Sequence, residues 1–326
     1  MSMTLVLGLD FGGTKLAAGL VDLQQGSVLA RRSMATPVSG GAPASLQAML
    51  AMAQELIAAA PAPVQGVGIS FGGPVAADGR TVRLSMHVAG WEHVPLATHV
   101  EEALGLPAIV ANDGDAAALA EYHFGAGRGV RHLLYLTVST GIGGGIIIDG
   151  RLHRGERAWA GEAGHQVLKP DGPPCPCGRN GCLEALASGL SIAREARLRL
   201  RGPDGATSAL AAIPSDALTA QHVAEAAAAG DALARTVWNE AMGWLGIGIA
   251  SAANLLNPGR VVLGGGLTRA GALLFDPVRH VVARRVIDPE VSVVPAALGD
   301  DVGILGGAAL LGCVSIWGHW VQRGCW

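Results

Sequence analysis

Aromatic and charged side chains are both scarce in this sequence. Phe, Trp and Tyr make up 4% of the 326 residues, so the core has to be built mainly from Ala, Val, Leu and Ile. The chain is long enough to bury sizeable cores. Charged residues make up 15%, with a formal net charge of −3. The absence of a basic excess argues against nucleic acid as the main partner, because phosphate backbones are bound chiefly by Lys and Arg.

The N-terminus lacks the features of a secretory signal. No basic region precedes Leu5, and Asp10 interrupts the apolar run that follows. We therefore expect a cytoplasmic protein. Near the other end, Val302–Gln322 has no Asp, Glu, Lys or Arg and is long enough to span a bilayer. Because this segment is rich in Gly and contains His319, we interpret it as a buried helix followed by an apolar tail, with no membrane partner.

Two common nucleotide-binding motifs are also missing. The sequence Gly8-x4-Gly13-Thr14-Lys15 is close to a P-loop, but Thr and Lys are in the reverse order and a strand follows where a P-loop has a helix. No G-x-G-x-x-G follows a strand and opens a helix, so a dinucleotide-binding fold has no support.

Glycine turns between apolar segments are present instead. Residues 4–22 and 133–150 both read as strand, glycine turn, strand. This recurrence suggests two duplicated lobes that face each other across a cleft. Glycines leave backbone N–H groups open to a phosphate. The alternative is a tight hairpin whose glycines need positive φ.

Helical segments separate the strands. Residues 44–60, 113–124 and 216–257 have helical composition and end near Pro61, Gly125 and Pro258. Strands that alternate with helices predict an α/β fold, and the length predicts two lobes.

One stretch concentrates most of the cysteines. His165, Cys175, Cys177 and Cys182 lie among Gly and Pro residues, and three thiolates with one imidazole are a closed, structural zinc set. A disulfide is the alternative, but three thiols would leave one unpaired.

Two carboxylates flank this array. Glu162 precedes His165 by three residues and Glu184 follows Cys182 by two, so a metal would hold both in one place. Glu184 also fits as the N-terminal charge of a short helix that Gly189 ends.

The sequences GEAGH, CPCGRNGCLE and ASG resemble the signature of the ROK family of sugar kinases and regulators. The resemblance extends from about Leu5 to about Leu311. It implies that the His165 and cysteine cluster binds zinc, and that Glu162, His165 and Glu184 contact sugar hydroxyls.

The glycine turns resemble those of the actin–hexokinase–Hsp70 ATPase fold, a two-lobed, ribonuclease H-like α/β fold to which the ROK family belongs. DFGGT is similar to its first phosphate loop, STGIGGG to its second, and LGGG at 263–266 to its adenosine loop. The ATP-binding residues implied are Asp10, Gly12, Gly13, Thr14, Lys15, Thr140, Gly141, Gly143 and Gly265. Asp10 would hold Mg²⁺ through water, unless it only begins a turn.

The resemblance also predicts the domain bounds. Residues 1–118 form the N-terminal lobe, completed by a C-terminal helix at 301–320, and residues 119–300 form the C-terminal lobe with the second phosphate loop, the zinc loop and the adenosine loop.

Phosphoryl transfer needs one group that accepts the proton of the nucleophile. The sequence VANDGDAAALAE resembles the ND-x6-7-E motif of the family, which makes Asp113 the base and Asn112 a sugar ligand. Gly73, in SFGGPV, would line the sugar site. Alternatively Asp113 caps the following helix, unless Asp115 takes that place.

These motifs predict ATP-dependent phosphorylation of a hexose at the 6-hydroxyl, with glucose first. N-acetylmannosamine or N-acetylglucosamine is the alternative, because GISFGGPV and NDGDAAALAE also resemble the N-acyl hexosamine kinases. Gly72, Ala76 and Met86-His87 stand where the family often has Pro, Asp and Pro-Asn, so these motifs leave the identity of the hexose open. The resemblance also predicts a homo-oligomer, either a dimer or a tetramer.

Two other classes of function are less well supported. ROK transcriptional regulators carry a helix-turn-helix domain before the first phosphate loop, which begins here at Asp10. A sugar-binding protein without catalysis is disfavoured because both glycine turns and Asp113 are present.

Overall fold

The computed structural model describes residues 3–85 and 87–312. The chain packs as two compact units. Unit 1 consists of Met1–Leu133, Gly145–Gly161 and Ala296–Trp326, and unit 2 consists of Leu134–Gly144 and Glu162–Pro295. The predicted boundary between residues 118 and 119 lies within helix α3 (Asp113–Phe124), all of which belongs to unit 1. The lobe bounds given above stay a prediction.

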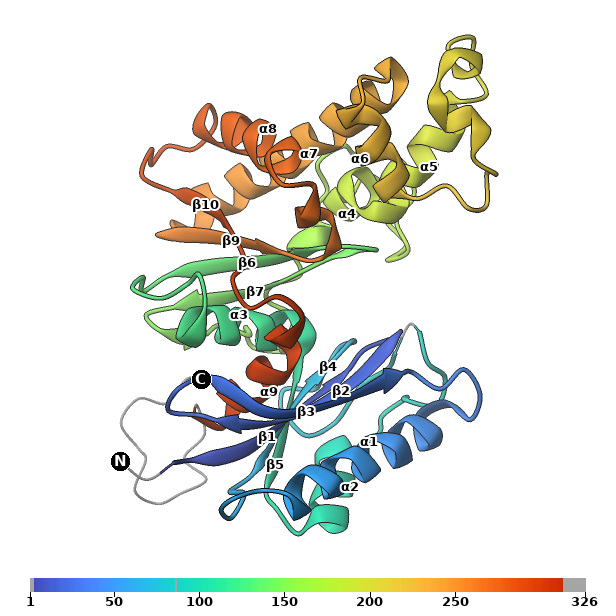
Figure 1. Cartoon of the computed structure of the whole chain (residues 1–326). Helices are drawn as coiled ribbons and strands as arrows, with labels where there is room; N and C mark the ends of the chain where they lie inside the picture. Colours follow the sequence, from blue (N-terminus) through green and yellow to red (C-terminus); the bar gives the residue numbers. More distant parts are fainter. Residues whose placement is uncertain (1–2, 86, 313–326) are drawn as a thin grey trace. The chain divides into compact units, whose positions relative to one another are not determined.

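Unit 1 is built on a five-stranded mixed sheet (Figure 1). Its strand order is β3-β2-β1-β4-β5, with β1 antiparallel to β2 and parallel to β4. The strands are β1 Leu5–Phe11, β2 Lys15–Asp22, β3 Ser27–Ala35, β4 Val67–Phe71 and β5 Ala108–Asn112. The helices of this unit are α1 Gly41–Ala58, α2 Leu96–Leu104, α3 and α9 Val302–Gly312.

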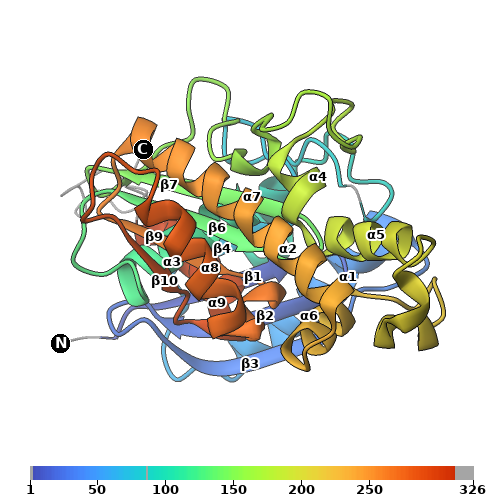
Figure 2. The ribbon, with the colours of Figure 1, turned by 90° about the horizontal axis from the view of Figure 1, so that it is seen from above.

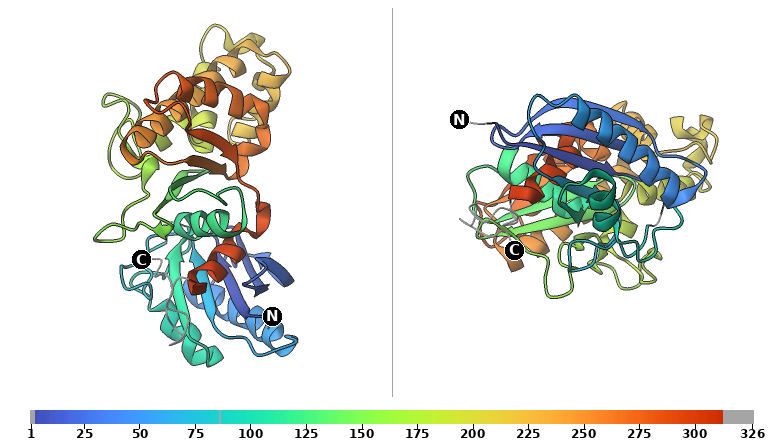
Figure 3. Two further views of the ribbon diagram at one scale, coloured as in Figure 1. Left: turned by 90° about the vertical axis from the view of Figure 1, so that its left-hand side faces the viewer. Right: turned by 90° about the horizontal axis from the view of Figure 1, so that it is seen from below.

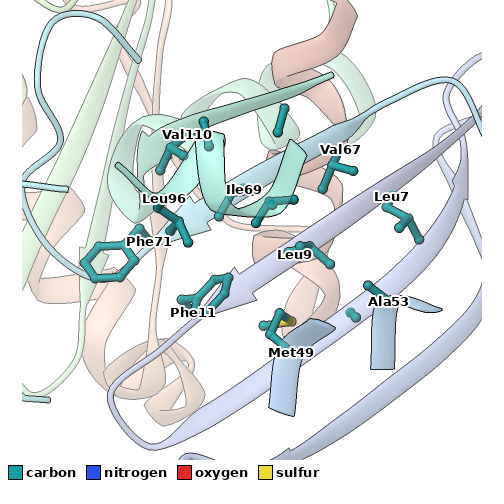
Figure 4. Close-up of a cluster of buried hydrophobic side chains, with 14 of the residues drawn as sticks. Leu7, Leu9, Phe11, Met49, Ala53, Val67, Ile69, Phe71, Leu96 and Val110 are labelled. Atoms are coloured by element: carbon teal, nitrogen blue, oxygen red, sulfur yellow. The ribbon is translucent and has the colours of Figure 1, made fainter. Parts of the chain in front are cut away.

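The two faces of strand β1 carry different residues. Successive side chains of a strand point to opposite faces, so Leu7, Leu9 and Phe11 share one of them. They are buried with Met49 and Ala53 of α1, as Figure 4 shows. Each large apolar side chain buried in this way contributes about 1.5–3 kcal/mol relative to an exposed one. This cluster is the core of unit 1.

Helix α9 covers the other face at unusually short range. A β-carbon added to Gly8 would lie 1.9 Å from the carbonyl oxygen of Ile304, and one added to Gly68 would lie 1.7 Å from that of Gly307. Glycine at these positions therefore lets the helix backbone rest on the strand backbone. In Figure 3, α9 (red) lies beside α3 (green) within unit 1.

The second sheet repeats the strand order of the first. It runs β10-β9-β6-β7-β8. If β6 to β10 are renumbered 1 to 5 and the sheet is read from the β8 edge, the order is 3-2-1-4-5, as in the first sheet. The strands are β6 Leu133–Val138, β7 Ile142–Ile148, β8 Arg151–Leu152, β9 Arg260–Gly264 and β10 Ser292–Pro295. The duplication predicted from the two glycine turns is therefore observed in the strand order.

The remaining helices belong to unit 2. They are α4 Leu183–Ala187, α5 Gly189–Arg199, α6 Ala220–Ala228, α7 Ala232–Leu256 and α8 Ala272–Ala283. Figure 2 shows α7 and α8 side by side. The predicted helix at 216–257 is two helices, because Gly230 has a φ of 100° and Asp231 begins α7 as its N-cap. Asn257, with a φ of 43°, ends α7 before Pro258, close to the predicted end.

The C-terminal segment is described only in part. The predicted helix at 301–320 begins at Val302, and the described part reaches Gly312. The predicted apolar tail lies outside the described residues. Within residues 3–85 and 87–312, no helix combines the length and the hydropathy needed to cross a membrane.

Candidate functional site

The first glycine turn connects β1 to β2. Its backbone closes through a hydrogen bond from the N–H of Gly12 to the carbonyl oxygen of Lys15 (3.1 Å). Neither Gly12 nor Gly13 has positive φ, so the hairpin requirement considered above does not apply. Close approach explains both glycines. Added β-carbons would lie 2.8 Å from the Lys15 carbonyl oxygen and 2.7 Å from the His87 side chain.

Thr36 supports this turn from the residue that follows β3. Its hydroxyl donates to the carbonyl oxygen of Gly12 (2.8 Å), and its N–H donates to that of Thr14 (3.0 Å). The turn is thus held by the edge of its own sheet.

Asp10 lies next to this turn on the face of β1 that α9 covers. Its Oδ1 accepts a hydrogen bond from the hydroxyl of Ser70 (3.0 Å). A β-carbon on Gly303 would lie 2.3 Å from the carboxyl carbon, so a larger residue at this position of α9 would displace the Asp10 carboxylate. Burial raises the pKa of Asp10, and the Ser70 hydrogen bond and the charges of Lys15 and Arg31 lower it less than burial raises it. A nearby cation would stabilise this desolvated carboxylate, which suits the water-mediated Mg²⁺ site predicted here.

The junction between β5 and α3 carries the predicted base. Here Asn112 is the N-cap, with its Oδ1 accepting from the N–H of Gly114 (2.8 Å). The suggestion that Asp113 or Asp115 caps this helix is therefore wrong. The side chain of Asn112 reaches two residues past its own position, whereas Asp113 is already the first helical residue.

Asp113 lies close to the first glycine turn within unit 1. A β-carbon on Gly72 would be 3.9 Å from Asp113 Oδ2, 3.9 Å from the Gly12 Cα and 3.3 Å from the carbonyl oxygen of Phe11. Asn112 also donates from Nδ2 to the carbonyl oxygen of Gly73 (3.0 Å). The structure therefore brings the predicted base, the predicted sugar-binding loop and the first phosphate turn together.

Three aromatic rings lie beneath these groups. The rings of Phe11 and Phe71 lie 5.6 and 5.0 Å from that of Trp91, edge to face. Phe11, Phe71 and Trp91 line one small cavity with Gly12, Gly13 and Gly72. The chain has few aromatic residues, and these three rings pack together next to the first turn and the Gly72 loop, which they support.

The cysteines and histidine predicted to bind zinc come together. The ligand atoms of His165, Cys175, Cys177 and Cys182 all lie within 4.8 Å of one another, and the three thiols are free. Cys175 Sγ is 3.7 Å from His165 Nδ1, and Cys177 Sγ is 3.6 Å from Cys182 Sγ. In a tetrahedron with Zn–S bonds of about 2.3 Å the sulfurs are about 3.7 Å apart. The donor set and its spacing fit Zn²⁺, and the disulfide alternative is not observed.

The pKa values of two thiols in this loop are shifted in opposite directions by their surroundings. Burial raises the pKa of Cys175 to about 12, whereas the backbone N–H of Arg179 is the main cause that lowers the pKa of Cys177 to about 7.

His165 can serve both of its predicted roles. Its Nδ1 faces Cys175, while its Nε2 lies 3.8 Å from Glu162 Oε2. Burial raises the pKa of Glu162, the His165 charge lowers it and the Glu184 charge raises it again. One ring nitrogen therefore faces the thiols and the other faces the carboxylate predicted to bind sugar.

Glu184 connects the cysteine loop to the second glycine turn. Its Oε2 accepts from the N–H of Ile142 (2.8 Å), and its Oε1 lies 4.0 Å from Cys175 Sγ. A β-carbon on Gly141 would be 2.5 Å from Glu184 Oε2. Gly141 and Gly143 have no positive φ either, so Gly141 matters here because it leaves room for the Glu184 carboxylate.

The start of α5 also holds the second turn. The N–H of Gly189 donates to the carbonyl oxygen of Ser139 (2.7 Å), and that of Leu190 to Thr140 (3.3 Å). Gly189 was predicted to end the helix that carries Glu184, but α4 ends at Ala187 and Gly189 begins α5. Ser188 is the reason, because it is the C-cap of α4 and also the N-cap of α5.

The predicted adenosine loop follows β9 in unit 2. Gly265 has a φ of 88°, and a β-carbon there would lie 2.5 Å from the carbonyl oxygen of Val138. Gly265 therefore lies beside the end of β6, just before the second turn.

Sequence reasoning missed the role of Glu121. This fully buried carboxylate accepts from the N–H groups of Ala126 (2.7 Å), Ala297 (2.9 Å) and Leu298 (3.0 Å). It thus fixes the chain where it re-enters unit 1 after β10. The available signal was its position as the acidic end of the ND-x6-7-E motif.

Comparisons with known proteins cover nearly the whole chain. A glucokinase of Streptomyces coelicolor is 37% identical over 94% of this chain and 98% of its own length. An N-acetylmannosamine kinase of Citrobacter koseri is 36% identical over 93% of this chain and 97% of its own length. The crystal structure of a ROK family glucokinase from Streptomyces griseus, in complex with glucose and AMPPNP, is 38% identical, covers 94% of this chain and 98% of its own, and has a TM-score of 0.79.

The resemblance stated from the motifs is thereby confirmed. The sequence model of the ROK family matches residues 6–312, and this chain belongs to the ROK family.

Proposed function

We propose that this protein is an ATP-dependent kinase that phosphorylates a hexose at the 6-hydroxyl, with glucose as its main substrate. The glucokinase relatives support this assignment, and so does the solved glucokinase in complex with glucose and AMPPNP. The observation that carries it is the place of Asp113, whose carboxylate lies against the Gly72 loop next to the first glycine turn.

Each predicted residue then has a role within its own unit. Asp113 accepts the proton of the 6-hydroxyl as this oxygen attacks the γ-phosphate. Asn112 and Gly73 position the hexose beside it. Open backbone N–H groups and side chains serve the nucleotide in each unit. The residues assigned in unit 1 are Asp10, Gly12, Gly13, Thr14 and Lys15, and those assigned in unit 2 are Thr140, Gly141, Gly143 and Gly265. Asp10 would hold Mg²⁺ through water, and this ion would supply positive charge to the phosphates.

Unit 2 contributes the remaining sugar ligands in this proposal. Glu162, His165 and Glu184 accept or donate hydrogen bonds to sugar hydroxyls. Zn²⁺ on His165 and the three cysteines keeps this loop in one conformation. We further propose that the protein is cytoplasmic and acts as a homo-oligomer.

A second candidate is an N-acetylmannosamine or N-acetylglucosamine kinase. The N-acetylmannosamine kinase relative, almost as similar as the glucokinases, favours it. The two candidates differ only at the 2-position of the sugar, so the same catalytic groups serve both.

A coupled assay tests both candidates. The purified protein is given ATP, Mg²⁺ and in turn glucose, mannose, fructose, N-acetylglucosamine and N-acetylmannosamine, and ADP formation is measured. We expect the highest kcat/KM with glucose. The highest value with an N-acetylated sugar establishes the second candidate, and turnover of none of the five sugars rejects the kinase assignment.

A further inference from the structure

Two connections join the loop after β4 to the junction that carries Asp113. The first is the hydrogen bond from Asn112 to Gly73 described above. The second runs through Arg154, which follows β8. Its guanidinium donates to the carbonyl oxygen of Ala76 (3.0 Å) and also reaches that of Ala77 (3.5 Å).

The same guanidinium pairs with the helix that Asp113 begins. Arg154 Nε lies 3.4 Å from Asp115 Oδ2, and only 9% of the Arg154 side chain and 7% of the Asp115 side chain are exposed. Asp113 thus lies in sequence between the two connections, because the first is made by Asn112 and the second by Asp115. All of these residues belong to unit 1.

A buried ion pair is an expensive way to hold two segments together. Removing two charges from water costs several kcal/mol per ion, and apolar residues of similar size often stabilise a fold as well or better. Stability alone therefore does not explain the pair. A guanidinium can, however, interact with acceptors on two segments at once, because its N–H donors are held in a rigid planar arrangement.

We propose that Arg154 is a positioning residue for the phosphoryl transfer. It sets the separation between the base Asp113 and the Gly72–Ala77 loop that holds the hexose. This inference rests on the proposed function, and it adds to it a residue that touches neither substrate. Its action runs through Asp115 on one side and the carbonyl groups of Ala76 and Ala77 on the other.

The proposal makes a specific kinetic demand. A displacement of about 1 Å between a catalytic group and its substrate can cost about 100-fold in rate. Loss of the Arg154 guanidinium should therefore lower kcat and raise the KM of the hexose. The KM of ATP should change little, because the atoms that Arg154 contacts are not among those assigned to the nucleotide.

The test compares Arg154→Lys with Arg151→Lys. Both variants keep the charge and lie in the same short segment, but Arg151 is exposed and has no role in the proposed site. We expect Arg154→Lys to lower kcat/KM for the hexose by about 10- to 100-fold, with the KM of ATP unchanged. Arg151→Lys should behave like the wild type.

A second variant separates positioning from folding. Asp115→Asn should produce the same selective defect, and combining it with Arg154→Lys should add little further loss, since both act through one pair. Thermal unfolding and isothermal titration with glucose show whether each variant is folded and binds sugar. If a folded Arg154→Lys variant keeps wild-type hexose kinetics, or loses ATP and hexose affinity equally, the proposal is wrong. If the wild type phosphorylates no hexose, the proposed function fails first, and the role of Arg154 fails with it.

Discussion

The two glycine turns arise from the same strand order but are supported in different ways. The first is held by its own sheet, through the hydrogen bonds of Thr36 to Gly12 and Thr14. The second is held from outside its sheet, by Glu184 and by the start of α5. Glu184 in turn lies at the edge of the cysteine cluster.

Because of this difference, we expect ligand binding by unit 2, but not by unit 1, to depend on the cysteine loop. The nucleotide contacts proposed for unit 2 should depend on the order of the cysteine loop, because Glu184 follows Cys182, a predicted metal ligand, by two residues. Contacts in unit 1 should not, because Asp10 is packed by α9, and the first turn is supported by Thr36 and the aromatic cluster. In the proposed function, the catalytic base therefore belongs to unit 1 and the predicted zinc loop, which supports the second glycine turn, belongs to unit 2.

The largest expected effect lies in unit 1. Asp113→Asn removes the only proton acceptor assigned to the reaction, and general base catalysis typically contributes about 10²–10⁴-fold. We expect kcat for glucose phosphorylation to fall by that factor, measured by coupled assay, while titration calorimetry shows largely unchanged glucose affinity. Glu102→Gln, an exposed carboxylate of α2, serves as the control and should keep full activity. Near-normal turnover of Asp113→Asn would mean that another group is the base.

The second prediction concerns the metal loop of unit 2. Cys177→Ser should lower the zinc content, measured by mass spectrometry, and weaken both ATP and glucose binding by about 10-fold or more, because loss of metal loosens a loop that it folds. Thr36→Ala is the counterpart in the first turn. It should weaken ATP binding while the zinc content stays at the wild-type level.

Equal loss of zinc in both variants would contradict the expected difference between the two units. So would a zinc-free Cys177→Ser protein that binds ATP and glucose with wild-type affinity.

The motifs close in sequence were the most predictable part of this molecule. The glycine turns and the set of His165 and three cysteines could be found because a few neighbouring residues determine each of them. The alternative that Asp113 or Asp115 caps the helix was wrong, since Asn112 and Asp113 are both good caps and only the backbone conformation decides between them.

Contacts between distant segments could not be found in this way. Arg154 lies 78 residues from Ala76, and Glu121 lies 176 residues from Ala297. Neither partner is marked by its residue type, because both accept or donate through the backbone. Such contacts follow from the sheet order, which one sequence does not specify.

The smallest expected effect is on stability. It concerns one carboxylate in each unit and how its contribution to the free energy of unfolding changes with pH. In unit 2, partial burial alone would raise the pKa of Asp231, but hydrogen bonds from the N–H groups of Ala234 and Ala209 and from Ser208 lower it overall. In unit 1, Arg80 is the main cause that lowers the pKa of Glu101. A carboxylate with a lowered folded-state pKa stabilises the fold above its ordinary pKa, and this stability is lost as the pH falls through the folded-state value.

Asp231→Asn should therefore reduce the free energy of unfolding at pH 7 by about 1 kcal/mol, because the amide keeps the Oδ1 cap acceptor of α7 but replaces Oδ2, which accepts from Ser208 and from the N–H of Ala209. Glu101→Gln should cost about 0.5 kcal/mol, because its ion pair with Arg80 is partly exposed to solvent. Urea unfolding from pH 7 down to pH 3 should show both differences shrinking below about pH 4, where these carboxylates begin to be protonated in the unfolded chain and, at still lower pH, in the fold. A difference for Asp231→Asn that is constant over this range would show that the charge of Asp231 does not contribute to the stability of the fold.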